Sequence, residues 1–251
     1  MPYKLLPIFK KELINNKYFI ITFSDYEMAD QCHPGQFFRL KNPQQNFPIL
    51  PRPFSVNNIQ DKQTSFLIKI VGESTKNLFE TKIGENISLH GPLGNGFKIA
   101  RNKKVLIVSG GIGYAPFPFL LKKLEKAKDE IVFFHGGKSS DDIFSANVIN
   151  FTEDGSVGKK GLVTDGVEQF LQKNQVDIVY ACGPQIMLKK LTEICKQFNV
   201  DLQVSLETIM ACGIGVCCGC AIRIVENGKM VYKKVCKDGP VFDGYTVVWD
   251  E

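Results

Sequence analysis

The chain has 251 residues, of which 44% are hydrophobic and 23% charged, the composition of an ordinary globular protein with one large or two small domains. Its formal net charge is +5 and its Lys and Arg residues are scattered, so a nucleic-acid partner is not expected. It has no apolar run of bilayer length and no secretory signal, so we expect a cytoplasmic protein without a membrane partner. Eight cysteines in a reducing compartment are expected to be ligands or buried thiols.

The chain up to about residue 99 is a series of short stretches rich in aromatic and β-branched residues, separated by Pro, Gly, Asn and Asp. This pattern is typical of strands joined by tight turns. It predicts a small antiparallel β-barrel. The expected strands are 18–23, 36–40, 54–56, 65–71 and 86–89.

After residue 104 the pattern changes to apolar strands that alternate with helical stretches, which predicts a parallel α/β sheet. Strands are expected at 105–108, 131–134 and 177–181, and helices at 117–128 and about 184–198. The cysteine-rich remainder forms a third segment. We therefore predict three domains: 1–100, 101–205 and 206–251.

Four of the eight cysteines lie within nine residues, and their spacing is the most specific feature of the sequence. Cys212, Cys217 and Cys220 follow the C-x4-C-x2-C pattern of plant-type [2Fe-2S] clusters, with Cys236 as a distant fourth ligand. The alternative is a four-cysteine zinc site, but such sites normally pair two C-x2–4-C hooks rather than placing three ligands in one loop. Disulfides are less favoured, because the adjacent Cys217 and Cys218 cannot bridge comfortably.

The same loop allows two ligand registers, because Cys217 and Cys218 are neighbours. Neighbouring side chains tend to diverge, so only one of them can bind iron together with Cys220. The known spacing favours Cys217. Cys218 is then expected to point away, as a small buried side chain or an exposed thiol.

Two segments of the first domain have residue types that suit a flavin. Arg52-Pro53-Phe54-Ser55 combines an arginine for phosphate, an aromatic face for a ring, and a hydroxyl. Gly72-Glu73-Ser74-Thr75 opens a short helix, whose N-terminal N–H groups attract an anion such as pyrophosphate. Each has a structural alternative: an edge strand with Phe54 in the core, or a plain helix cap by Ser74 or Thr75.

Two segments of the second domain suit a nicotinamide nucleotide. Gly110, Gly111 and Gly113 follow a buried strand, where glycines let the backbone approach a pyrophosphate. Cys182-Gly183-Pro184 ends a later strand, so both segments are expected at the carboxyl edge of one sheet. Cys182 could face the nicotinamide; the alternative is a small buried thiol. The segment 136–142 has no arginine to hold a 2′-phosphate and carries two acids, which favours NAD over NADP.

The order of these motifs resembles the ferredoxin-reductase-like family. With the cysteine loop near the end of the chain, the resemblance extends to the electron-transfer subunits of type B dihydroorotate dehydrogenases, over nearly the whole length. The segments that carry it are Arg52-Pro53-Phe54-Ser55, Gly72-Glu73-Ser74-Thr75, Gly91-Pro92-Leu93-Gly94-Asn95-Gly96-Phe97, Gly110-Gly111-Ile112-Gly113, Cys182-Gly183-Pro184 and the cysteine loop, and the most specific is Ser205-Leu206-Glu207 leading into Met210-Ala211-Cys212-Gly213-Ile214-Gly215-Val216-Cys217.

The resemblance implies a fold of β plus α/β type: an antiparallel Greek-key β-barrel for FAD, a doubly wound parallel-sheet domain for NAD, and a small [2Fe-2S] subdomain. Two departures from the family are Phe54 in place of a usual tyrosine and Ser74 in place of a usual glycine. By position, Arg52, Pro53, Phe54, Ser55, Leu67, Ile68, Lys69, Ser74 and Thr75 would contact FAD, and Cys212, Cys217, Cys220 and Cys236 would bind the cluster.

The function implied is electron transfer in pyrimidine biosynthesis, from the FMN of a separate dihydroorotate dehydrogenase subunit through the cluster and FAD to NAD+. The resemblance also implies a two-plus-two heterotetramer. The protein's part is then positioning and potential tuning, so we assign no catalytic acid, base or nucleophile. Two alternatives remain: a free-standing NAD(P)H diaphorase or ferredoxin reductase with a built-in [2Fe-2S] tail, and a non-catalytic zinc-binding module.

Overall fold

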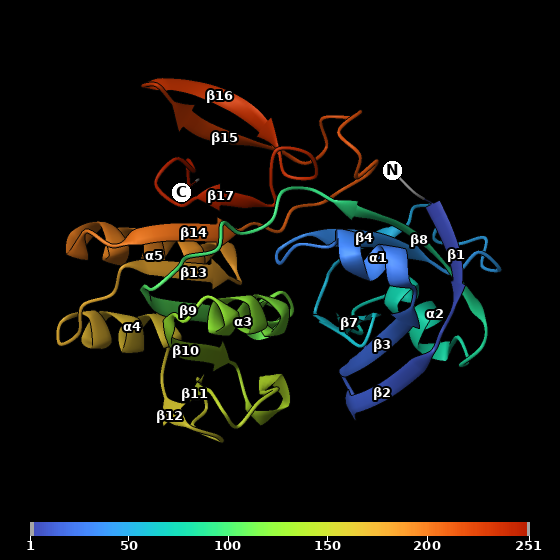
Figure 1. Cartoon of the computed structure of the whole chain (residues 1–251), viewed down its shortest axis with the longest axis horizontal. Helices are drawn as coiled ribbons and strands as arrows, with labels where there is room; N and C mark the ends of the chain where they lie inside the picture. Colours follow the sequence, from blue (N-terminus) through green and yellow to red (C-terminus); the bar gives the residue numbers. More distant parts are fainter. Residues whose placement is uncertain (1–2, 250–251) are drawn as a thin grey trace.

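The structure, a computed structural model, describes residues 3–249, which fold into three parts that follow one another in the chain (Figure 1). The first part contains β1 (Tyr3–Pro7), β2 (Lys10–Asn15), β3 (Tyr18–Ser24), α1 (Tyr26–Gln31), β4 (Phe37–Lys41), β5 (Arg52–Ser55), β6 (Asn58–Gln60), β7 (Gln63–Lys69), α2 (Glu73–Glu80) and β8 (Asn86–Leu93). The second contains β9 (Lys104–Gly110), the 3-10 turn η1 (Gly111–Tyr114), α3 (Phe117–Lys126), β10 (Glu130–Gly137), the 3-10 turn η2 (Ser140–Asp142), β11 (Ile149–Thr152), β12 (Lys159–Lys160), α4 (Val163–Leu171), β13 (Ile178–Cys182), α5 (Gln185–Phe198) and β14 (Asp201–Ser205). The third contains β15 (Ala221–Glu226), β16 (Lys229–Lys234) and β17 (Val241–Asp243).

The first part is an antiparallel barrel built from two four-stranded sheets, with strand orders β1-β8-β4-β5 and β2-β3-β7-β6. Its interior is filled by aromatic side chains that meet edge to face, such as Phe23 and Phe38 against Phe66. These residues alternate along their strands with outward-facing ones, as a half-buried strand requires. The prediction of an antiparallel barrel is confirmed.

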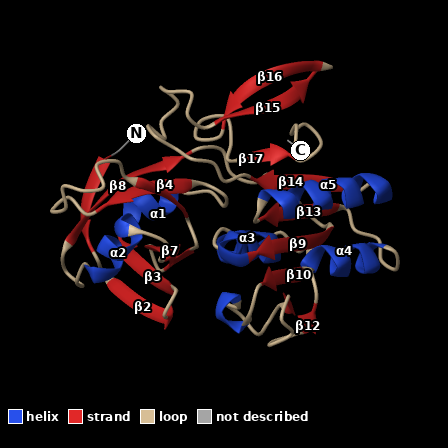
Figure 2. Cartoon of the chain, turned by 180° about the vertical axis from the view of Figure 1, so that it is seen from behind, coloured by secondary structure: helices blue, strands red, loops and turns tan. Residues whose placement is uncertain are grey.

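The second part is a parallel sheet with helices on both faces, in the order β12-β11-β10-β9-β13-β14. Along β9, Val105 and Ile107 pack with α3, whereas Leu106 and Val108 pack with α4 and α5. The strand is therefore apolar at every position from 105 to 108, because both of its faces are buried. Opposite views show α3 on one side of the sheet and α4 with α5 on the other (Figures 1 and 2). The predicted doubly wound sheet is confirmed.

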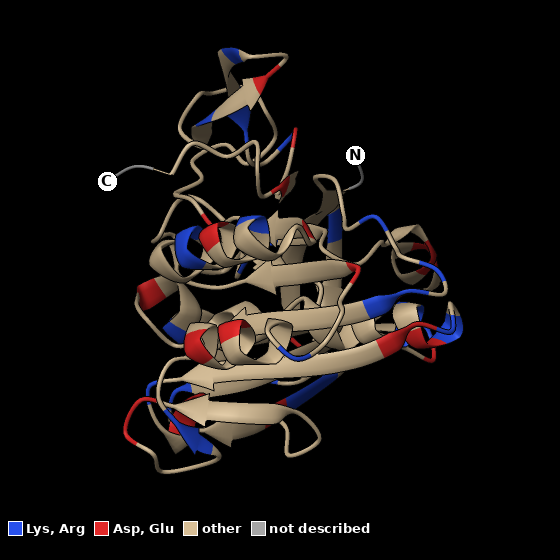
Figure 3. Ribbon diagram, turned by 90° about the vertical axis from the view of Figure 1, so that its left-hand side faces the viewer, with Lys and Arg blue, Asp and Glu red and all other residues tan. Residues whose placement is uncertain are grey.

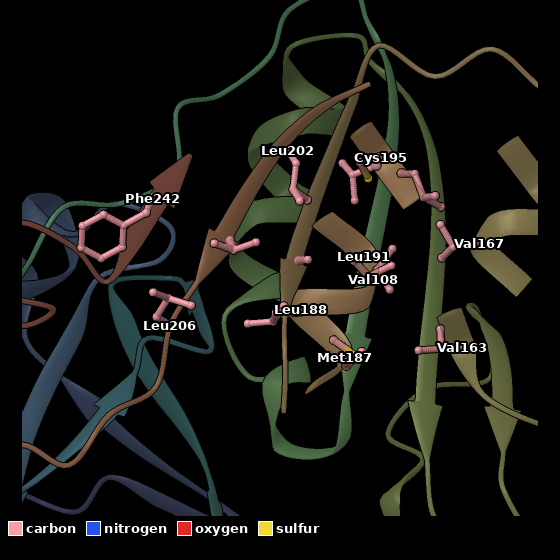
Figure 4. Packing of buried hydrophobic residues seen from close by; sticks show 14 of the residues in the cluster. Val108, Val163, Val167, Met187, Leu188, Leu191, Cys195, Leu202, Leu206 and Phe242 are labelled. Atoms are coloured by element: carbon pink, nitrogen blue, oxygen red, sulfur yellow. The ribbon is translucent and has the colours of Figure 1, made fainter. Parts of the chain in front are cut away.

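The third part is joined to the edge of this sheet. Strand β17 pairs antiparallel with β14, and the Leu206 N–H donates to the Pro240 carbonyl at 2.9 Å. Phe242 of β17 adds its ring to the core formed by α5 and β14, where Leu188 and Leu202 lie (Figure 4). The β15–β16 hairpin projects beyond the body and carries both basic and acidic residues (Figure 3). The boundaries 1–100, 101–205 and 206–251 stay a prediction.

Hydrogen bonds fasten the barrel to the parallel-sheet part. The side-chain amide of Asn57 donates to the Ala115 carbonyl at 2.8 Å, and the Phe119 N–H donates back to the Asn57 carbonyl at 2.9 Å. Phe119, from α3, lies in the core of the barrel. The two parts thus share packing as well as hydrogen bonds. Within residues 3–249, none of the helices combines the length and the apolar character needed to cross a bilayer.

Candidate functional site

A cavity of about 700 Å³ lies where the barrel meets the other two parts. All the residues that we predicted for FAD line it except Ile68. Strand alternation explains the exception: Leu67 and Lys69 face the cavity, while Ile68 points into the barrel core and is fully buried. The lining residues that we predicted are Arg52, Pro53, Phe54, Ser55, Leu67, Lys69, Ser74 and Thr75.

Other lining residues were not predicted individually. Those inside motifs that carried the family resemblance are Gly72, Glu73, Ile112, Ser205, Leu206, Glu207 and Met210. Phe37 had no signal of its own, because an apolar residue next to a cavity resembles one in a core. The remaining unpredicted lining residues are Phe47, Pro48, Val71, Ala115, Thr208 and Pro240.

The N-terminus of α2 opens toward this cavity, and Thr75 organises it. The Thr75 hydroxyl accepts hydrogen bonds from the N–H groups of Val71 and Gly72 and donates to the Gly72 carbonyl at 2.8 Å. Thr75, at the third helical position, thus supplies the capping side chain, which leaves Ser74 as the hydroxyl of this helix that a ligand in the cavity can reach. Ser74 lies within the helix and is not among the described residues with positive φ, so its difference from glycine imposes no strain.

The predicted nucleotide segments meet at the carboxyl edge of the parallel sheet. Cys182 of β13 is the register partner of Ser109 of β9, so the glycine turn and the Cys182-Gly183-Pro184 turn lie side by side. A Cβ on Gly113 would overlap the Cys182 carbonyl oxygen, and one on Gly110 would lie 2.7 Å from the Met187 sulfur. The glycines therefore allow the close approach of the two turns.

Cys182 itself is only 1% exposed, and its thiol packs in the apolar core beside Tyr180. Burial raises the pKa of the thiol well above its usual range, with a smaller contribution from the Glu207 carboxylate. The Cys182 side chain therefore faces the core, whereas the turn that follows it reaches the surface at Pro184. Its assignment to the nucleotide site stays a prediction that rests on this turn.

The two acids of the segment 136–142 are both engaged in contacts with the barrel. Asp141 pairs with Lys17 at 2.8 Å, and Asp142 accepts a hydrogen bond from the Tyr18 hydroxyl at 2.6 Å. Asp142 also accepts from the Lys138 N–H at 3.0 Å. The preference for NAD therefore rests on the absence of an arginine from this segment rather than on free carboxylates.

The four predicted ligand cysteines converge around the glycine-rich loop. The Cys220 and Cys236 sulfurs lie 3.2 Å apart, and both side chains are 2% exposed. Backbone N–H groups point at two of the four sulfurs: Cys217 N–H donates to Cys212 Sγ at 3.3 Å, and Gly215 N–H donates to Cys236 Sγ at 3.1 Å. Amide donors directed at sulfur stabilise thiolates and are one of the means by which proteins tune iron–sulfur clusters.

The same hydrogen bonds act on the thiols themselves. Backbone N–H groups of Ile214 and Cys217 lower the pKa of Cys212 to about 6. Burial, together with the nearby Cys220, raises the pKa of Cys236 to about 12. Cys218 is exposed and has no part in these contacts, as the register through Cys217 requires. All the cysteines are free, and no three His, Cys, Asp or Glu side chains in residues 3–249 are arranged around a single metal ion.

One continuous segment connects the three candidate sites. Leu206, Glu207 and Thr208 line the large cavity and also a second cavity of about 500 Å³, which Gly183 and Pro184 border. Two residues after Met210, another lining residue, the chain reaches Cys212. The predicted cluster site is therefore adjacent to the predicted flavin site. The predicted nucleotide edge borders the second cavity, on the other side of the segment from Leu206 to Thr208.

The residues that line the large cavity fit a flavin. The large cavity combines apolar walls, formed by Phe54 and Leu67, with the cations Arg52 and Lys69 that suit a flavin and its phosphates. The hydroxyl oxygen of Thr208, at the junction of both cavities, is buried without a hydrogen-bond partner and is available to a ligand. Burial raises the pKa of the Glu207 carboxyl, although its side chain reaches solvent through the cavities.

Comparison with known proteins agrees with this arrangement. Residues 207–248 match the family model of the iron-sulfur cluster binding domain of dihydroorotate dehydrogenase B. The dihydroorotate dehydrogenase B (NAD(+)) electron transfer subunit of Caldanaerobacter subterraneus subsp. tengcongensis is 46% identical over 84% of this chain and 85% of that protein. The electron transfer subunit of the same name from Desulforamulus reducens is 33% identical over 94% of each chain.

Solved structures give the same architecture. The NADH-dependent reduced ferredoxin-NADP oxidoreductase, solved in work on flavin-based electron bifurcation, has a TM-score of 0.85 at 30% identity and covers 98% of this chain and 90% of its own. A ferredoxin NADP+ reductase from Neisseria gonorrhoeae, solved with bound FAD and NADP, has a TM-score of 0.65 at 16% identity, covers 78% of this chain and 91% of its own, and shares the fold alone. Fold, cysteine loop and relatives converge on one conclusion: the chain belongs to the family of electron transfer subunits of NAD+-dependent dihydroorotate dehydrogenase B.

Proposed function

We propose that this chain carries electrons between an FMN-containing dihydroorotate dehydrogenase catalytic subunit and NAD+, as a step of pyrimidine biosynthesis in the cytoplasm. The large cavity holds FAD, the edge at Gly110 and Gly183 holds the nicotinamide nucleotide, and Cys212, Cys217, Cys220 and Cys236 hold a [2Fe-2S] cluster. The two subunits assemble as a two-plus-two heterotetramer.

The observation that carries this proposal is the segment from Ser205 to Cys212. It borders the flavin cavity, runs into the cysteine loop, and meets the nucleotide edge at Gly183. Bound FAD and the cluster supply the exchange between electron pairs and single electrons that dihydroorotate, the cluster and NAD+ require. The chain's own residues position these groups and keep water away from them.

Individual residues have distinct roles in this scheme. Phe54 offers an aromatic face to the flavin ring, Arg52 offers a guanidinium to its phosphates, and Ser74 offers a hydroxyl at the helix N-terminus. The carboxyl edge of the sheet accepts the nucleotide through backbone N–H groups rather than through side chains. None of these residues transfers a proton to or from dihydroorotate.

The test is expression of this chain with and without the catalytic subunit of the same organism. The isolated chain should show flavin absorption with a cluster shoulder, contain iron and sulfide, and oxidise NADH with artificial acceptors. It should turn over dihydroorotate only in the complex. A colourless protein with stoichiometric zinc, dihydroorotate oxidation by the isolated chain, or failure to bind the catalytic subunit would contradict the proposal; the last would favour a free-standing diaphorase.

A further inference from the structure

Arg39 is a charged residue in the middle of barrel strand β4. Its neighbours Phe38 and Leu40 belong to the barrel core, and the whole Arg39 residue is only 8% exposed. A buried guanidinium is costly unless it is hydrogen-bonded and close to negative charge. The burial of Arg39 is therefore stable only if hydrogen-bond acceptors or anions lie close to its guanidinium.

The hydrogen bonds of Arg39 fall short of this requirement. Nη2 donates to the Ala211 carbonyl at 3.3 Å, and Nε is buried without a partner. In the part of the chain that the structure describes, no carboxylate forms an ion pair with Arg39. One weak bond to a neutral carbonyl leaves most of the donor capacity of the guanidinium unused.

Two parts of the molecule face Arg39: the cysteine loop, and His90, its register partner on β8, whose pKa is lowered by burial and by the Arg39 charge, so His90 supplies no counter-anion. Gly213 has a φ of 63°, and a Cβ there would lie 2.6 Å from Arg39 Cδ and 2.8 Å from Nε. The side chain thus packs directly beneath the first turn of the loop, which passes over the barrel near β4 and β8 (Figure 1). Burial lowers the pKa of Arg39, and the charges of the Cys212, Cys236 and Cys217 thiolates act in the opposite direction.

We propose that Arg39 is the buried counter-charge of the iron–sulfur site, placed by the flavin barrel to favour the reduced cluster. This inference rests on the cluster of the proposed function. A cluster with four thiolates is anionic, and reduction adds one electron and therefore one negative charge. A fixed cation close by stabilises the more negative state more strongly, and low local polarity enlarges the effect. Arg39 is therefore a positioning and tuning residue.

Lys234, another cation near the loop, does not fulfil this role. Its Nζ reaches the loop but donates to the Gly215 carbonyl at 2.8 Å and is partly exposed. Water screens a partly exposed charge far more than a buried one. Arg39 is also anchored on the strand that carries Phe37, a residue of the flavin cavity, so the barrel fixes its distance from the loop.

The test compares Arg39→Gln, Arg39→Lys and Lys41→Gln in the complex with the catalytic subunit. Lys41 lies on the same strand, and its Nζ bonds the Ile49 carbonyl at 2.9 Å, so Lys41→Gln removes one charge outside the loop. Iron and sulfide content is measured first, and the midpoint potential of the cluster then follows from EPR-monitored redox titration. Wild-type protein without iron would refute the proposed function itself rather than the role of Arg39.

For Arg39→Gln we expect a lower potential, by about a tenfold change in the reduced-to-oxidised ratio, which is about 59 mV for a one-electron couple. Arg39→Lys should stay close to wild type, as should Lys41→Gln. An unchanged potential in Arg39→Gln overturns the proposal. If Arg39→Gln loses its iron, retention of iron by Arg39→Lys supports the counter-charge, and equal loss in both variants shows a packing role instead.

Discussion

The Tyr18 hydroxyl donates a 2.6 Å hydrogen bond to Oδ1 of Asp142, and this contact joins the barrel to the parallel-sheet domain. Tyr18 is fully buried in β3, and Asp142 lies in η2 beyond the end of β10. The Asp142 carbonyl is 2.7 Å from His135 Nε2, whose other ring nitrogen is 2.7 Å from the Ser109 hydroxyl. A buried polar network thus runs from the barrel to the turn expected to hold the nucleotide.

We expect Tyr18→Phe to lower the free energy of unfolding by about 1–3 kcal/mol, because it removes a donor from a buried carboxylate. Urea unfolding at neutral pH measures this loss. The control is Lys17→Gln, which breaks the exposed Lys17–Asp141 pair and should cost less than about 1 kcal/mol. Equal losses in the free energy of unfolding for the two substitutions would show that the buried hydrogen bond stabilises the fold no more than the exposed ion pair does.

The contribution of Asp142 should depend on pH. Burial alone would raise the pKa of its carboxyl, but the Tyr18 hydroxyl, the Lys138 N–H and the charges of Lys69 and Lys17 outweigh burial and lower it. A lowered pKa in the folded state means that the stabilisation is present above the ordinary Asp pKa and is lost as the pH falls through the folded value. The stability difference between wild type and Asp142→Asn should therefore be largest near neutral pH and shrink in acid. A constant difference would contradict this.

The ligand register of the cysteine loop can be tested by single substitutions. We expect Cys218→Ala to keep its iron, sulfide and reduced-state EPR signal, because Cys218 is exposed and outside the sulfur cluster. Alanine at Cys212, Cys217, Cys220 or Cys236 should lose or cripple the cluster, because an iron without its thiolate opens to solvent or takes a weaker ligand. A normal cluster in Cys217→Ala together with loss in Cys218→Ala would move the register by one residue.

The glycine turn of the nucleotide edge gives a further test. We expect Gly113→Ala to raise the KM for NADH and to lower the free energy of unfolding by about 1–3 kcal/mol, because its Cβ would overlap the Cys182 carbonyl oxygen. Gly228→Ala is the control: it adds a Cβ in open space at a φ of 74°, in the β15–β16 hairpin. It should cost a little stability and leave the KM unchanged. Steady-state kinetics with an artificial acceptor separates the two.

NADH should be preferred to NADPH. Beyond β10, Lys138 is the one basic residue of the segment 136–142, and the two acids there are held by Tyr18 and Lys17. A single lysine without an arginine gives a 2′-phosphate weak support. The ratio of kcat/KM values for NADH and NADPH measures the preference. Equal values would refute it, and Lys138→Ala would then show whether Lys138 is responsible.

Long, periodic elements were predictable from the sequence. The apolar run 105–108 became the centre of β9, and the helices expected at 117–128 and 184–198 became α3 and α5 within two residues at either end. Short elements without a periodic signal were missed, such as β6, β11 and β12. Helix α4 was missed as well. It contains Gly166, a residue of low helix propensity, because a larger side chain at this position would overlap the Phe151 ring.

The site was predictable where chemistry restricts residue type. Cysteines at ligand spacing and glycines at a tight turn are seldom needed for packing alone, and the structure brings the members of each group together. Phe37 was not predictable, because contact with a cavity across domains leaves no trace in local sequence. Strand alternation places the side chains of Leu67 and Lys69 at the cavity and that of Ile68 in the core, so the assignment of Ile68 to FAD stays a prediction that rests on its main chain.

The pairing of β17 with β14 makes the cluster-bearing segment a cap on the sheet as well as a carrier of electrons. Without residues 241–243, the main-chain N–H and C=O groups of Gln203 to Ser205 would form an unpaired edge strand, with which a strand of another chain could pair. The core would also lose the Phe242 ring. Transplanting the barrel and nucleotide domain without this cap would therefore yield a protein prone to self-association, and the three parts are not interchangeable modules.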